Sequence, residues 1–198
     1  MVMLKLRSKT MTEPSIEPPT PRIPPHKRVY AVGDIHGHLD LLRRLQAAID
    51  EDVRAHPGAE CIEVYLGDYV DRGPKSAAVI DALIERQASR KAVCISGNHE
   101  AVMIDALQSR EAFSRWLKMG GLETVFSYVG HRRTLDDVTL WSQWRAAMTP
   151  AHLAFLRRLA SHFICGDYLF VHAGLRPGVA LEDQSREDMM WIRREFLD

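Results

Sequence analysis

The stretch VYAVGDIHG (residues 29–37) decides the fold of this chain, because a short apolar run ends at a glycine that an aspartate follows. The same arrangement returns in CIEVYLGDYVDRG (residues 61–73), and a similar one in AVCISGNHE (residues 92–100). A short apolar run bounded by turn residues is typical of a fully buried strand. The sequence therefore predicts strands over residues 29–32, 61–66 and 92–95, each followed by a polar loop that contains glycine.

Helical patterns separate these strands. Between residues 39 and 53, apolar side chains recur at the spacing of an amphipathic helix, and His56-Pro57-Gly58 ends the pattern. Residues 76–87 and 101–107 show shorter versions of the same pattern. Strand, loop and helix in threefold repetition predict an α/β fold with a parallel sheet.

Residues 1–27 and 110–159 differ from this repeat. The first segment is polar and proline-rich, so we expect a disordered tail ahead of a domain over residues 28–198. The second segment is mostly helical and carries no chemical motif, which favours a helical cap or insertion. Beyond it, Gly166-Asp167 separates two apolar runs and predicts a hairpin whose second strand leads into His172.

The bulk composition argues against several classes of protein. The formal net charge of the 198 residues is zero, which disfavours a general nucleic-acid binder or a membrane-surface binder. No apolar run reaches the length of a membrane span, and the N-terminus lacks the apolar core of a secretory signal. The three cysteines fit no zinc or disulfide spacing, and we interpret them as buried side chains in a reducing compartment. We therefore expect a cytoplasmic protein.

Residue types that bind metals follow the predicted strands. They are Asp34, His36, Asp68, Asn98, His99 and His172. Ligands of parallel α/β sheets collect beyond the carboxyl ends of the strands, so four separate loops can converge on one point. Each residue alone has a structural explanation, such as a helix cap or a core histidine, but four such loops together are hard to explain structurally. The sequence therefore predicts a metal site.

The mixture of ligand types indicates which metals this site binds. Carboxylates, an amide oxygen and imidazoles without a thiolate suit Mn²⁺, Fe or Zn²⁺. Asp68 lies between the other ligands in the sequence, where it can bridge two ions. A site with two such ions activates water and stabilises both ends of an in-line displacement at phosphorus.

Four glycine-containing or histidine-containing motifs follow one another along the chain: GDIHG (33–37), GDYVDRG (67–73), GNHE (97–100) and VHAG (171–174). In order and separation they resemble the calcineurin-like metallophosphoesterases. More narrowly, they resemble the protein serine/threonine phosphatase branch, which includes bacterial phosphatases and the symmetrical diadenosine tetraphosphatases. The resemblance covers about residues 28–196. It implies a two-sheet α/β sandwich flanked by helices, in which metal-activated water attacks phosphorus.

The resemblance also implies which residues bind the two divalent ions, for which Mn²⁺ is the favoured identity. Asp34 and His36 would bind the first ion, and Asp68 would bridge both. Asn98 and His172 would bind the second ion.

Two further roles in catalysis follow from the same resemblance. His99 would be the general acid, held by Asp71, because a neighbouring carboxylate orients an imidazole and keeps it protonated. Arg72 would bind the substrate phosphate with its planar fork of donors. Trp191-Ile192-Arg193 resembles a motif in which the arginine is a second phosphate ligand.

One motif of the family is absent from this sequence. Family members carry a further histidine in a Gly-His-Thr-like loop beyond the Trp-Ile-Arg motif, and no Gly-His-Thr occurs here. We therefore expect a chain that is cut short and lacks its C-terminal strands. Its second metal site would be one ligand short.

Three functions remain open at this point. The first is a phosphoprotein phosphatase acting on phosphoserine or phosphothreonine. The second is a hydrolase of dinucleoside polyphosphates or related nucleotides that uses the same site. The third is a truncated relative that binds metal or a partner without catalysis.

Overall fold

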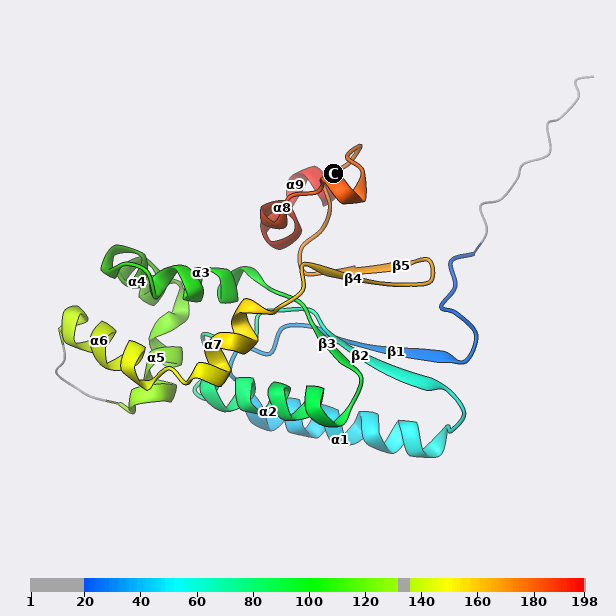
Figure 1. Cartoon of the computed structure of the whole chain (residues 1–198), viewed down its shortest axis with the longest axis horizontal. Coiled ribbons are helices and arrows are strands. Elements are labelled where there is room, and N and C mark those ends of the chain that lie inside the picture. Colours follow the sequence, from blue (N-terminus) through cyan, green and yellow to red (C-terminus); the bar gives the residue numbers. More distant parts are fainter. Residues whose placement is uncertain (1–19, 132–135, 198) are drawn as a thin grey trace, which may run out of the picture.

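A computed structural model of the chain describes residues 20–131 and 136–197. Its centre is a parallel sheet of β1 (Lys27–Val32), β2 (Glu60–Tyr65) and β3 (Ala92–Cys94), in that order (Figure 1). Val32 pairs with Tyr65, and Tyr65 pairs with Cys94, so the three strands end at the same edge of the sheet. The predicted strands and the parallel sheet are confirmed.

Two helices cover one face of this sheet. α1 (Leu39–Ala55) and α2 (Ser76–Ser89) lie side by side below the strands in Figure 1. They bury apolar side chains such as Leu42, Ile80 and Leu83 in a core cluster that includes Tyr65 of β2. The amphipathic pattern of the sequence predicted these contacts, because a helix must bury its apolar stripe against the sheet.

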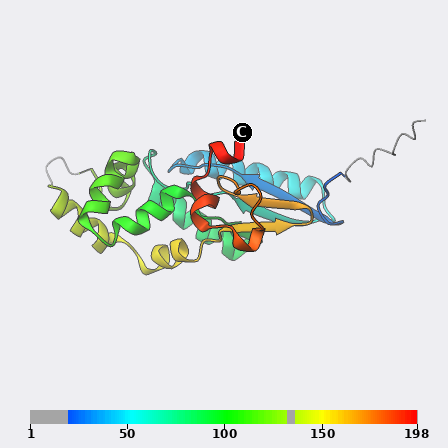
Figure 2. The ribbon, with the colours of Figure 1, turned by 90° about the horizontal axis from the view of Figure 1, so that it is seen from above.

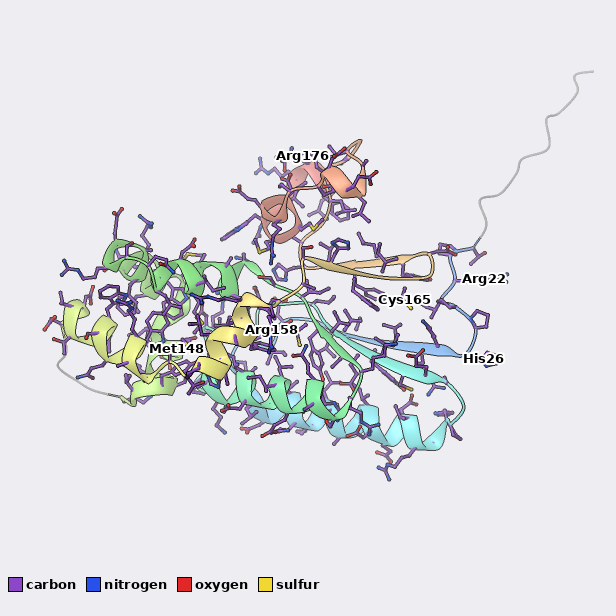
Figure 3. The ribbon with its side chains drawn as sticks, viewed as in Figure 1. Arg22, His26, Met148, Arg158, Cys165 and Arg176 are labelled. Carbon is purple, nitrogen blue, oxygen red and sulfur yellow. The ribbon has the colours of Figure 1, made fainter. Side chains whose placement is uncertain are left out.

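The predicted hairpin covers the opposite face. It consists of β4 (His162–Cys165) and β5 (Tyr168–Val171), which pair antiparallel. Cys165 points from the hairpin toward the three-stranded sheet (Figure 3), where it joins a core cluster with Ile62, Val64 and Ile95. The chain is thus a two-sheet arrangement with helices outside.

Most of the predicted N-terminal tail, residues 1–19, lies outside the described residues. Residues 20–26 run beside the hairpin. The backbone N–H of Arg22 donates to the Asp167 carboxylate, and the Asp167 N–H donates to the Arg22 carbonyl. Ile23 packs against the cluster beneath the hairpin. Arg22 and Ile23, which we had placed in the tail, therefore pack against the domain.

Residues 110–131 and 136–157 are mostly helical, as expected, and extend to one end of the molecule (Figure 2). The elements are α4 (Arg110–Trp116), the kinked turn η1 (Leu117–Gly121), α5 (Leu122–Val129), α6 (Asp137–Ala147) and α7 (Pro150–Arg157). Trp116, Trp144 and Phe113 are fully buried in this part. The chain ends with η2 (Leu181–Asp183), α8 (Arg186–Trp191) and α9 (Arg194–Leu197). Within residues 20–131 and 136–197, no helix has the length and apolarity needed to cross a membrane.

The third predicted helix begins earlier than expected. We predicted residues 101–107, whereas α3 spans Asn98–Ala106. Gly97 precedes the helix in extended conformation, and the Glu100 carboxylate accepts the Gly97 N–H, which satisfies a donor at the helix start. Asn98 and His99 therefore lie in the first turn of a helix rather than in a loop.

Candidate metal and phosphate site

The predicted site residues converge at the carboxyl edge of the sheets. Asp34 and His36 follow β1, Asp68 follows β2, and His172 follows β5. A cleft of about 490 Å³ opens there. Its lining consists of Asp34, Asp68, Arg72, Asn98, His99, His172, Ala173, Met190, Trp191, Ile192, Arg193 and Leu197.

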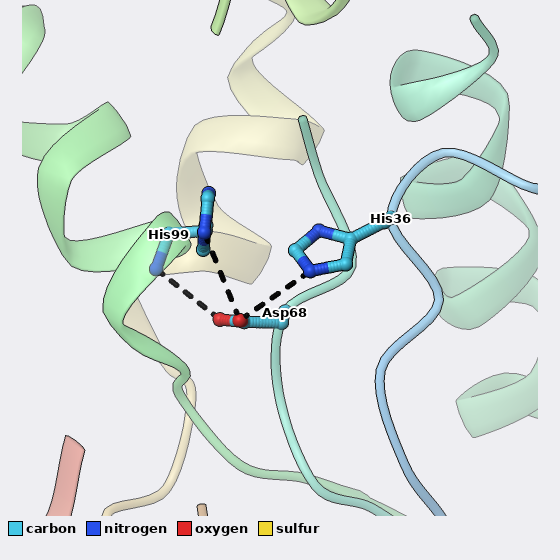
Figure 4. Close-up of side chains that lie close together, drawn as sticks. All are labelled: His36, Asp68 and His99. Atoms are coloured by element: carbon cyan, nitrogen blue, oxygen red, sulfur yellow. Dashed lines mark hydrogen bonds and ion pairs between the residues drawn. The ribbon is translucent and has the colours of Figure 1, made fainter. Parts of the chain in front are cut away.

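Asp68 lies at the centre of this group, as Figure 4 shows for two of its neighbours, His36 and His99. Its Oδ2 is 3.6 Å from His36 Nε2 and 3.9 Å from His99 Nε2, and its Oδ1 is 3.5 Å from His172 Nε2. Candidate ligand atoms form two groups around it. One group holds His36, Asp68 and His99, and the other holds Asp34, Asp68 and His172. Asp68 belongs to both groups.

The histidine side chains fit a divalent cation. His36 Nδ1 donates to the Val70 carbonyl at 2.8 Å, which leaves the lone pair of Nε2 on the buried side without a hydrogen-bond partner among the described residues. His172 Nδ1 likewise donates to the Leu66 carbonyl at 2.8 Å, and its Nε2 lies 3.1 Å from Asn98 Oδ1. A carbonyl that fixes the tautomer is typical of metal-binding histidines. The lone pairs of His172 Nε2 and Asn98 Oδ1 face each other, and a divalent cation bound by both atoms would remove their repulsion.

Strained backbone presents several of these side chains to the cleft. His36, Asp68, Asp71 and Arg72 adopt positive φ angles of 45°, 54°, 72° and 65°. A residue other than glycine in this region costs about 1–3 kcal/mol and persists only where surrounding contacts hold it. Such residues cluster at functional sites, and four of the five in the described chain lie here.

His99 and Asp71 form the predicted pair. His99 Nδ1 lies 2.7 Å from Asp71 Oδ2, and the Asp71 side chain is fully buried. Burial alone lowers the pKa of His99, but the hydrogen bond to Asp71 and the charges of Asp68 and Asp71 outweigh it, so this pKa is raised. The ring therefore keeps its proton to a higher pH than a free histidine.

Arg72 contacts the other nitrogen of the same ring. Its Nη2 lies 3.2 Å from His99 Nε2. Since Nδ1 donates to Asp71, Nε2 of the neutral ring accepts from Arg72. The positive charge of Arg72 acts on the pKa of His99 in the opposite direction, since it disfavours the protonated ring.

Two residues of the helical segment complete the surroundings of Asp71, and the sequence did not reveal them. Trp116 Nε1 donates to Asp71 Oδ2 at 2.8 Å, and Thr124 Oγ1 donates to Asp71 Oδ1 at 2.7 Å. Segment 110–159 carries no metal-ligand motif, so we had expected only a cap or packing layer there.

Glu100 is a second residue that sequence reasoning missed. Its carboxylate is fully buried and accepts the backbone N–H groups of Asp68, Tyr69 and Val70 at 2.7–3.2 Å, besides that of Gly97. These bonds hold the strained turn that carries Asp68. The fourth position of the GNHE motif was the available signal.

The environment of Glu100 predicts how the free energy of unfolding depends on pH. Burial, together with the charge of Asp68, raises the pKa of Glu100 to about 7 from 4.5. The folded state then holds this proton more tightly than the unfolded chain, so the stabilisation is present below pH 4.5 and is lost as the pH rises through 7. In EDTA, the free energy of unfolding is expected to fall by about 3 kcal/mol between pH 4.5 and 8 through this group.

Denaturant unfolding at several pH values measures this effect. Glu100→Gln should remove that part of the pH dependence, whereas the exposed Glu182→Gln should retain it. Equal pH dependence in the wild type and in Glu100→Gln would show that Glu100 does not titrate in this range.

The arginine near the C-terminus lies at the same cleft. Trp191, Ile192 and Arg193 form part of the lining, beside Asn98 and His172. Every residue predicted to bind metal or phosphate lines this cleft except His36. The Nε2 of His36 lies 3.6 Å from Oδ2 of Asp68, which does line the cleft. The site residues are thus brought together as expected.

Comparisons with known proteins agree with this geometry. The family model for calcineurin-like phosphoesterases matches residues 27–196. The chain is 29% identical over 166 residues to a zinc-dependent endopolyphosphatase of Saccharomyces cerevisiae, covering 77% of this chain and 48% of the relative. It is 33% identical over 157 residues to a symmetrical bis(5'-nucleosyl)-tetraphosphatase of Acidovorax ebreus, covering 78% of this chain and 47% of the relative.

A shorter match reaches a protein phosphatase. The chain is 34% identical over 96 residues to serine/threonine-protein phosphatase 1 of Salmonella typhimurium, covering 48% of this chain and 39% of that protein. The chain spans about half the length of the curated relatives that it matches over most of its own length.

Solved structures support the fold. The "Crystal structure of a putative diadenosine tetraphosphatase" superposes with a TM-score of 0.54 at 22% identity, covering 84% of this chain and 59% of that one. The family match spans nearly all described residues, including the strand ends that carry Asp34, Asp68 and His172. This chain belongs to the calcineurin-like phosphoesterase family.

Proposed function

We propose that this chain hydrolyses phosphoric monoesters in a metal-dependent reaction, with phosphoserine and phosphothreonine in proteins as its substrates. The observation that supports this most is one cleft that holds acidic and imidazole ligands around Asp68 next to the His99–Asp71 pair. Exposed side chains at this cleft, including Asp34, Trp191 and Arg193, leave room for a phosphate carried on a protein surface.

Two divalent ions are part of this proposal. Asp34 and His36 would hold the first ion, Asn98 and His172 would hold the second, and Asp68 would contribute to both. Such ions, when bound, supply Lewis-acid activation of water and of the phosphoryl group. Mn²⁺ is the proposed identity, since hard oxygen ligands and imidazoles suit it. Zn²⁺ is the alternative, because one relative is named as zinc-dependent.

The chain's own residues bind the phosphate and deliver the proton. Arg72 and Arg193 donate to phosphate oxygens and offset the negative charge that develops there. As water attacks phosphorus and the bond to the serine or threonine oxygen breaks, His99 Nε2 donates its proton to the leaving oxygen. Asp71 holds the ring so that Nε2 faces the cleft.

A second candidate function is hydrolysis of dinucleoside polyphosphates. The relative with this activity matches 78% of the chain, whereas the protein phosphatase matches 48%. In addition, Trp191 lines the cleft and is 39% exposed, so its ring can stack on a nucleobase.

A direct comparison of substrates tests these proposals. With Mn²⁺, we expect release of phosphate from a phosphothreonine peptide at a rate at least about tenfold above that from diadenosine tetraphosphate, and no turnover in EDTA. Turnover of the nucleotide alone, with two nucleoside diphosphates as products, would replace the first candidate with the second. Absence of both reactions together with absence of bound metal would support the non-catalytic alternative.

We also propose a cytoplasmic location. The three cysteines are free, and Cys94 and Cys165 are buried side chains in the two core clusters. Unpaired cysteines are typical of reducing compartments.

A further inference from the structure

The turn from Trp116 to Thr124 contacts the loop that carries Asp71 and Arg72. Both oxygens of the buried Asp71 carboxylate are engaged: Oδ2 by His99 Nδ1 and Trp116 Nε1, and Oδ1 by Thr124 Oγ1. Two of these three donors come from the helical segment. That segment therefore determines where the carboxylate lies relative to His99.

Backbone contacts join the same two stretches. The Asp71 N–H donates to Thr124 Oγ1 at 2.7 Å, and the Arg72 N–H donates to the Gly120 carbonyl at 3.1 Å. Gly120 has a φ of 108°, and a Cβ built on it would lie 3.2 Å from Arg72 Cγ. The glycine permits the turn and this close approach. Asp71 and Arg72, both left-handed in φ, are thus held by residues 120–124.

The indole of Trp116 is itself held in place. It is fully buried, with its ring centroid 4.8 Å from that of Trp144 and 6.1 Å from that of Phe113. Gly121 lies against the ring so closely that a Cβ there would come within 2.4 Å of it. A side chain packed on both sides presents its N–H at a fixed position.

We infer that Trp116 and Thr124 are positioning residues for the general acid, an inference that rests on the proposed function. They hold Asp71, and Asp71 aims His99 Nε2 at the leaving oxygen. The helical segment is then a part of the catalytic machinery and not only a cap. The effect of losing either donor depends on how much the leaving oxygen needs a proton.

Trp116→Phe tests this inference, because phenylalanine preserves most of the packing and removes the N–H. With phenyl phosphate, whose leaving group needs a proton, kcat is expected to fall about 10- to 50-fold, as a part of the general-acid contribution. With 2,4-dinitrophenyl phosphate, whose leaving group departs without one, kcat should change less than about twofold. Equal losses with both substrates, or no loss, would overturn the inference.

Matched variants separate positioning from packing. Trp144→Phe alters the same aromatic cluster, but Trp144 Nε1 has no hydrogen-bond partner in the described part of the chain, so both rates should stay near those of the wild type. Thr124→Val removes the second donor and Thr124→Ser retains it. If Trp116→Phe fails to fold, the valine and serine variants decide the question by the same substrate comparison.

One measurement does not need turnover. The His99 Nδ1 proton in its bond to Asp71 should give a downfield proton resonance in NMR, and Trp116→Phe and Thr124→Val should shift or broaden it, while Trp144→Phe should not. An unchanged resonance would overturn the positioning role. The wild type can show the downfield resonance, with the expected changes in the variants, and still hydrolyse neither ester. That result would contradict the proposed function and leave the positioning role intact.

Discussion

We expect the replacement of His99 with asparagine to lower kcat for a phosphothreonine peptide by about two to four orders of magnitude, the usual size of a general-acid contribution. The reason is the geometry of the ring. Nδ1 is held by the buried Asp71, the pKa of the ring is raised above that of a free histidine, and the ring lines the cleft that contains Asp68. Asparagine has no group that can deliver a proton near neutral pH.

Metal content and substrate choice distinguish this role from a structural one. We expect His99→Asn to bind two equivalents of metal like the wild type, as measured by elemental analysis after gel filtration. With 2,4-dinitrophenyl phosphate the loss should shrink to less than about tenfold, because that leaving group does not need protonation. Loss of metal together with activity would instead assign His99 as a ligand, a reading that its group with His36 and Asp68 also permits.

We expect the replacement of Asp68 with asparagine to weaken both proposed metal sites at once. Its side chain is 7% exposed, its two oxygens face His36, His99 and His172, and it belongs to both groups of candidate ligands. Loss of a partner that only orients a ligand costs about 10- to 100-fold in metal affinity, so loss of the shared ligand should exceed about 100-fold at both sites. Activity should fall below detection at micromolar Mn²⁺.

Calorimetric titration with Mn²⁺ measures this prediction, with Asp34→Asn as the matched control. Asp34 is 58% exposed, its Oδ2 lies 3.8 Å from His36 Nε2, and in the proposed ligand set it contributes to the first ion only. The control should therefore weaken one binding event and retain the other. If Asp68→Asn also retains one tight event, Asp68 does not bridge two ions.

Local patterns in the sequence were sufficient for most of the fold. β1, β2 and β3 were predicted within two residues, because a buried parallel strand is a short apolar run that ends at a turn residue. The site types Asp34, Asp68 and His172 followed from the same pattern, since each lies just beyond a strand. The start of α3 was misplaced, because the bond between the Glu100 carboxylate and the Gly97 N–H lets the helix begin inside the stretch 97–100 that we had predicted to be a loop.

The contacts that orient the site residues could not be predicted from short stretches of sequence. Trp116 and Thr124 lie 45 and 53 residues from Asp71 in the chain, and no spacing rule links them. Their side chains are also ordinary core residue types, so their residue types did not mark them as partners of a catalytic pair. The left-handed φ angles of Asp68, Asp71 and Arg72 likewise have no signature in residue type.

Patterns along the chain were enough to predict a parallel α/β sheet and the acidic and imidazole side chains that follow its strands. These features depend on the apolar and glycine pattern along each short stretch. The orientation of the side chains depends on contacts between distant parts of the chain. Glu100 holds the turn of Asp68, and the helical segment holds Asp71 against His99. The physical reason is that a buried carboxylate must be satisfied by donors, and folding brings those donors from distant parts of the chain.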